Sequence, residues 1–149
     1  MNNSSMSTVL SLALMIGSSS GADLPFSDGP GDWRAQRRLI DLHQHINGTP
    51  EHVARAVRIM DAAGIGISVN LSGGTVTAKD GELSAFRKNQ DLSDRLAPDR
   101  FLLYMNLDYA GWDQSDFTQR AVQQVEEGHR LGAAGLKEFK RLGLYLRNR

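Results

Sequence analysis

Short apolar runs alternate along this chain with longer stretches in which apolar residues recur at helical spacing. The short runs predict β-strands at residues 37–43, 65–71, 100–106 and 133–139. The longer stretches predict helices over about residues 50–63, 82–96 and 115–131. Strands separated by helices of this length pair in parallel through right-handed crossovers. The pattern therefore predicts an α/β fold with about four parallel strands and three intervening helices.

Residues at the expected helix ends support this assignment. Thr49 can cap the first helix, Pro50 is tolerated in its first turn, and Gly64 suits a left-handed residue after its last turn. Pro98 ends the second helix and Gly132 ends the third.

The N-terminal segment has a different character. Residues 1–22 contain an apolar run at 9–16, too short to cross a bilayer, and end in Ser20-Gly21-Ala22, a small-x-small pattern typical of signal-peptidase sites. No Lys or Arg precedes Arg34, so the usual positive region is missing. We expect a signal peptide at 1–22, giving an exported protein without a membrane anchor, with a cytoplasmic protein as the alternative. Residues 23–36 are expected to be a linker.

Length and composition narrow the choice of function. The chain has 149 residues, and a complete (β/α)8 barrel needs about 250. Its 17 Lys and Arg residues balance 17 Asp and Glu residues, which argues against a nucleic-acid partner. The absence of cysteine excludes disulfides, thiolate metal sites and cysteine nucleophiles. A single domain acting on a small molecule fits these limits.

Two histidines at the end of the first expected strand are the main candidates for chemistry. Side chains alternate along a strand, so we expect Asp41, His43 and His45 to share one face. Two imidazoles placed in this way can converge on one divalent ion, and the pair alone does not choose between Zn, Ni, Fe and Co. Two histidines without any ion are the alternative.

The neighbours of this pair carry two further expectations. Asp41 lies on the same expected face, two residues before His43 and further from the strand end. We expect its carboxylate to orient a metal ligand by accepting a hydrogen bond from it. Ile40, Leu42 and Gln44 are expected to point to the opposite face, where the helices pack.

Residues 40–45 resemble the D-x-H-x-H signature on the first strand of the amidohydrolase superfamily. More specifically, the chain resembles the amidohydrolase-related branch that includes aminocarboxymuconate-semialdehyde-type decarboxylases. Three other segments are similar to that branch in order and spacing. They are residues 62–65, Asn89 with residues 98–101, and residues 131–137.

This resemblance implies a metal-dependent TIM barrel of (β/α)8 type. Its ion, often Zn, activates water for attack on an amide, ester or lactone, and some members decarboxylate their substrates instead. Only His43 and His45 carry over as metal ligands, because the family's other ligands lie on the fifth, sixth and eighth strands. Residues 37–149 are therefore expected to be the N-terminal half of such a barrel, truncated and inactive alone.

Lys137, on the fourth expected strand, has two possible roles in the resemblance. Some superfamily members carry a carbamylated lysine there that bridges two metals, and a lysine could equally bind a substrate carboxylate. A lysine that packs through its stem and reaches solvent is the alternative without a role.

A half-barrel would leave its interior face open and two strand edges unpaired, so we expect self-association. Two alternatives remain at this point. One is a small flavodoxin-like binding domain with an open sheet and helices on both faces. The other is a non-catalytic half-barrel that pairs with a complementary chain.

Overall fold

The computed structural model describes residues 30–138 and contains one curled sheet of four parallel strands in the order β1-β2-β3-β4. The strands are β1 (Leu39–Gln44), β2 (Ile65–Asn70), β3 (Phe101–Met105) and β4 (Gly135–Leu136). Each pairs in parallel with the next strand along the chain. The predicted half-barrel with four parallel strands is confirmed. The expected signal peptide and the first part of the linker, residues 23–29, lie outside the described residues.

Helices connect consecutive strands. They are α2 (Pro50–Ala63), α3 (Ala85–Leu96) and α4 (Phe117–Arg130). A further short helix, α1 (Pro30–Ala35), precedes β1 within the stretch expected to be a linker, and the sequence pattern gave no indication of it. None of the helices within residues 30–138 combines the length and the apolar character that a membrane crossing requires.

The helix ends follow the capping residues. At the start of α2, the Thr49 hydroxyl accepts a hydrogen bond from the backbone N–H of His52, and Gly64 ends the helix with a φ of 78°. In α3, the Ser84 hydroxyl accepts from the N–H of Arg87. Because Ser84 is the residue that can cap, α3 begins at Ala85, three residues later than residue 82, where periodicity alone placed it.

The helices α2, α3 and α4 pack on one side of the sheet. The buried side chains of Leu103 and Met105 on β3 form a cluster with Phe86 of α3. Gly128 of α4 lies directly on the Met105 sulfur, where a Cβ atom would have no room. A second cluster joins Val53 of α2 to Leu92 of α3 and to Ile46 after β1. The sequential strand order and the single helical layer match a barrel segment, whereas a flavodoxin-like sheet has helices on both faces.

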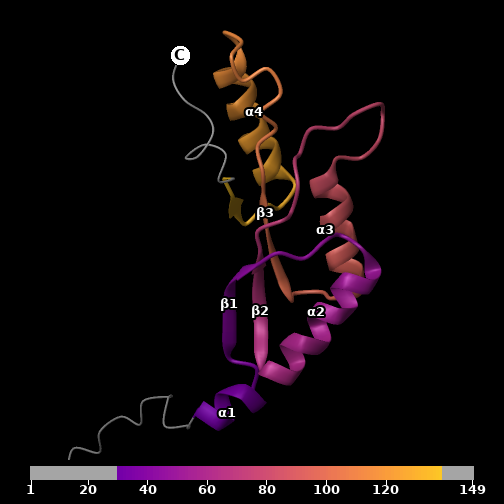
Figure 1. Cartoon of the computed structure of the whole chain (residues 1–149), viewed down its shortest axis with the longest axis vertical. Helices are drawn as coiled ribbons and strands as arrows, with labels where there is room; N and C mark the ends of the chain where they lie inside the picture. The colour runs from indigo at the N-terminus through magenta and orange to yellow at the C-terminus, as the bar shows by residue number, and fades with distance from the viewer. Residues whose placement is uncertain (1–29, 139–149) are drawn as a thin grey trace, which may run out of the picture.

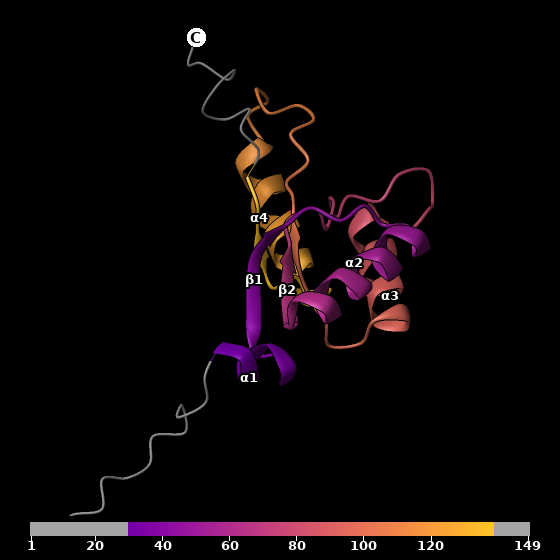
Figure 2. The ribbon, with the colours of Figure 1, turned by 60° about the horizontal axis from the view of Figure 1, so that its bottom comes forward.

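The other side of the sheet is uncovered. In Figure 2, α2 and α3 lie on one side of β1 and β2, and no described element lies on the other side. Asp41 aligns with Ser68, and Ser68 aligns with Phe101, which packs in the helix-side core. The side chains of the residues next to these three in each strand therefore face away from the helices. We call this side the uncovered face.

Ile40 and Leu42 belong to the uncovered face, and their side chains are 59% and 71% exposed. Our expectation that they pack beneath the helices was wrong. The reason is the pairing of β1 with β2, which turns Asp41 rather than its apolar neighbours toward the helical layer. In a closed barrel this face would be the interior, so apolar side chains on it agree with the half-barrel architecture.

The fully buried Phe86 ring provides a test of the helix-side core. Phe86→Ala should lower the free energy of unfolding by about 3–5 kcal/mol, because it removes a large buried side chain and leaves a cavity. Urea denaturation followed by circular dichroism measures this loss. The control Leu83→Ala, at a residue 59% exposed, should change stability by no more than about 0.5 kcal/mol. Equal effects of the two substitutions would show that α3 does not pack on the sheet as described.

Candidate metal centre

A β-bulge at the carboxyl end of β1 determines where the two histidines point. Asp41 pairs with Ser68 and Gln44 pairs with Asn70, so β1 advances three residues while β2 advances two. The Asp41 carboxylate accepts a hydrogen bond of 2.9 Å from the backbone N–H of His43. Its other oxygen accepts one of 2.8 Å from the Gln44 side chain. The His43 N–H bond, followed by the Gln44 bond, lowers the pKa of Asp41 below its usual range.

The bulge separates Asp41 from the histidines. Gln44 aligns with Asn70 on the helix side, and Ile46 is buried in the cluster with α2 and α3. His43 and His45 alternate with these two residues and therefore belong to the uncovered face. Strict alternation from Asp41 would instead have put His43 on the helix side. Our expectation that Asp41 shares a face with the pair and orients an imidazole was wrong, since its oxygens bind the His43 backbone and Gln44.

The two imidazole rings lie side by side. Their centroids are 5.2 Å apart and their planes are inclined by 64°. The Nδ1 atom of His45 lies 2.8 Å from the Ser72 hydroxyl oxygen, in the turn after β2. When Nδ1 donates this hydrogen bond, the lone pair of the ring is on Nε2, the arrangement that metal-binding histidines commonly use.

Three asparagines hold together the loops around this site, and we call them the rim asparagines: Asn70, Asn89 and Asn106. The Asn70 side chain accepts from the N–H of Ile46 and donates to the C=O of the same residue, both at 3.1 Å. It thereby extends the pairing of β1 and β2 by one more rung. Its oxygen also accepts from the N–H of Ser72, the partner of His45.

The other rim asparagines extend this network across the sheet. Asn106 donates to the C=O of Lys137 at 2.9 Å and accepts from the N–H of Gly74 at 3.2 Å. Asn89 of α3 donates to the C=O of Gly73 at 2.9 Å. Sequence reasoning gave Asn70 no role. The available indication was an asparagine at the end of the second and third apolar runs, Asn70 and Asn106, because strands disfavour asparagine.

Lys137 lies next to β4, at the opposite edge of the sheet from the histidines, which are at β1. Its backbone N–H donates to Met105, so it continues the pairing of β4 with β3. Alternation places it on the same face as Gly135, against which the Tyr104 ring of the uncovered face lies. Lys137 and the histidine pair thus belong to the same face of the sheet but are separated by β2 and β3.

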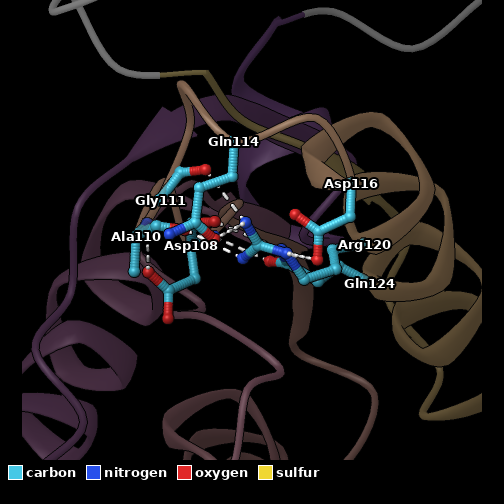
Figure 3. Close-up of polar contacts among 7 residues, drawn as sticks. All are labelled: Asp108, Ala110, Gly111, Gln114, Asp116, Arg120 and Gln124. Atoms are coloured by element: carbon cyan, nitrogen blue, oxygen red, sulfur yellow. Dashed lines mark hydrogen bonds and ion pairs between the residues drawn. The ribbon is translucent and has the colours of Figure 1, made fainter.

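The loop between β3 and α4 is held by one arginine (Figure 3). The Arg120 guanidinium donates to the backbone carbonyls of Ala110 and Gly111, each at 2.9 Å, and to the Asp116 carboxylate at 3.1 Å. The Gln124 side chain accepts from the N–H of Asp108 at 2.7 Å and so ties the start of this loop to α4. The loop is therefore a fixed part of the carboxyl rim.

The histidine pair offers two imidazole nitrogens as candidate metal ligands. Within residues 30–138 there is no group of three or more His, Asp or Glu side chains arranged to hold a metal ion. His52 is in the first turn of α2, and His129 is exposed near the end of α4. Among the described residues, an ion held between His43 and His45 would therefore have no third His, Asp or Glu ligand.

Comparisons of the chain with protein-family models, with curated proteins and with solved structures find no match.

The Tyr109 phenol on this rim gives a pH-dependent test. Burial, together with its 2.6 Å hydrogen bond to Glu138, raises the pKa of Tyr109 from 10.0 to about 12. The folded state therefore favours the neutral phenol. Its stabilising effect is complete below pH 10 and is lost as the pH rises from 10 through 12.

Ultraviolet titration of tyrosinate absorbance should show a component near pH 12 that Tyr109→Phe removes. Glu138→Gln should move that component toward lower pH without restoring a value of 10, because the burial of the ring remains. A Tyr109 that titrates at 10 in the unaltered protein would contradict the contact with Glu138.

Proposed function

We propose that this chain is the N-terminal half of a metal-dependent hydrolase of the amidohydrolase type, with His43 and His45 as two of its metal ligands. The observation that carries the proposal is the pair of adjacent imidazoles at the carboxyl end of the first strand, directed to the uncovered face of a half-barrel. In parallel α/β barrels this rim is where catalytic groups gather.

The residues around the pair fit a divalent ion. Neutral imidazole nitrogen is a good ligand for Zn and related metals. When Nδ1 of His45 donates its hydrogen bond to the Ser72 hydroxyl, Nε2 carries the lone pair for the ion. Asn70 fixes both Ser72 and Ile46 and therefore keeps the two strand ends, and with them the two rings, in register. In this proposal the remaining ligands of the ion come from strands that follow the four described here, as the resemblance to the amidohydrolase superfamily implies.

The substrate class follows from the resemblance to the amidohydrolase-related branch. We assign a small molecule with an amide, ester or lactone group, while decarboxylation is the variant reaction of that branch. A bound metal of this kind lowers the pKa of its water to about 7 and so supplies hydroxide at neutral pH. The chain's own contribution is to hold the pair of rings and the rim loops in place.

Metal titration of the full chain tests the proposal. Isothermal calorimetry with Zn²⁺, and the visible spectrum with Co²⁺, should show one ion bound per chain. The variant His43→Ala/His45→Ala should lose this binding, whereas His129→Ala, which removes an exposed imidazole on α4, should retain it. Equal binding by all three proteins would refute the proposed site.

Replacement of Ser72 tests the orientation of His45 separately. Ser72→Ala should weaken Zn²⁺ binding by about 10- to 100-fold, the usual effect of removing a hydrogen-bond partner of a metal ligand. Nitrogen NMR of the metal-free protein should at the same time show a change in the His45 tautomer ratio. Unchanged affinity and tautomer ratio would show that Ser72 has no role in positioning this ring.

A further inference from the structure

A hollow of about 470 Å³ lies at the free edge of the sheet, between the end of the outer strand β1 and the side of α2. His43 and His45 border it on the strand side, and His52 and Arg55 border it on the helix side. Its apolar lining is Ile46, Ala56 and Ile59. A volume of this size is within the range of small-molecule sites in proteins, about 300–1,000 Å³.

All the ionisable side chains that line the hollow are basic. The lining contains one guanidinium and three imidazoles and no carboxylate. This is unusual in a chain whose basic and acidic residues are equal in number. A guanidinium presents a planar fork of donors that matches the two oxygens of a carboxylate.

The Arg55 side chain has no ion pair or hydrogen bond with any residue in the described range 30–138. Its natural intrahelical partner is Glu51, one turn earlier in α2. The Glu51 carboxylate is instead at the helix cap, where hydrogen bonds from its own backbone N–H and from Thr49 lower its pKa. The Asp41 carboxylate, near the other wall, is bound by the His43 N–H and by Gln44. Both acids thus have other partners, and no described residue takes up the Arg55 donors.

We propose that this hollow binds the carboxylate group of a small organic acid, with Arg55 as the anchor and Ile59 and Ala56 against the apolar body of the ligand. The hollow shares His43 and His45 with the proposed metal site. Its assignment as a substrate subsite therefore rests on the proposed function, and it makes the substrate a carboxylate-bearing amide, ester or lactone. Binding of the anion itself needs no metal.

The experiment titrates the full chain, freed of metal with a chelator, with benzoate at low ionic strength and follows backbone NMR shifts. Benzoate should bind saturably and shift the resonances of α2 residues that line the hollow. Benzamide, which has the same shape without the charge, should bind at least about tenfold more weakly, because it loses the charge-assisted hydrogen bonds.

Variants identify the anchor. Arg55→Gln should weaken benzoate binding by about tenfold or more, since it removes the guanidinium fork. Arg58→Gln is the matched control, because Arg58 is an exposed arginine of the same helix that does not line the hollow, and it should bind benzoate like the unaltered chain. Equal binding of benzoate and benzamide, or equal binding by both arginine variants, would overturn the proposal. Zn²⁺ binding without benzoate binding would overturn this inference alone, and the reverse result would overturn the metal site alone.

Discussion

The position of both imidazoles depends on one irregularity of strand pairing. Between Asp41 and Gln44, β1 takes three residues to advance as far as β2 does in two. The Asp41 carboxylate stabilises the extra residue through the His43 N–H and the Gln44 amide. Because bulges redirect side chains, this one turns the histidines to the face that the helices leave open. A regular strand with the same sequence would have brought His43 beneath the helical layer.

The residues that stabilise the fold and the residues proposed for chemistry lie in different places. The first pack on the helix side of the sheet, and the second lie at the carboxyl ends of the strands. On the helix side, Phe86, Leu103 and Met105 form a closely packed core. At the carboxyl rim, the loops are held by side-chain amides rather than by apolar contacts, with Asn70 and Asn106 each bonding to backbone groups of neighbouring segments. A buried amide with all its partners fixes a single arrangement, because a shift of the loop would leave buried donors and acceptors unpaired. Such a rim is suited to holding ligands at defined positions.

The sequence predicted the helices and strands well, but it predicted less well which face of the sheet each strand residue points to. Four parallel strands followed from apolar runs, and the ends of α2 followed from Thr49 and Gly64, because these features depend on local chemistry. Local patterns do not encode the register between two strands, so the bulge was not foreseen, and Asp41, Ile40 and Leu42 were assigned to the wrong faces. Ser72 was also not predicted as a partner of His45, since residues 27 positions apart give no sequence signal of their contact. The histidine pair itself was evident from its spacing.

The central claim is that His43 and His45 together bind one divalent ion, and X-ray absorption spectroscopy of the zinc-loaded chain tests it most directly. The spectrum should require two imidazole nitrogens at about 2.0–2.1 Å from the metal, with the remaining positions occupied by oxygen. A coordination shell of oxygen alone, or one unchanged when both histidines are replaced by alanine, would contradict it.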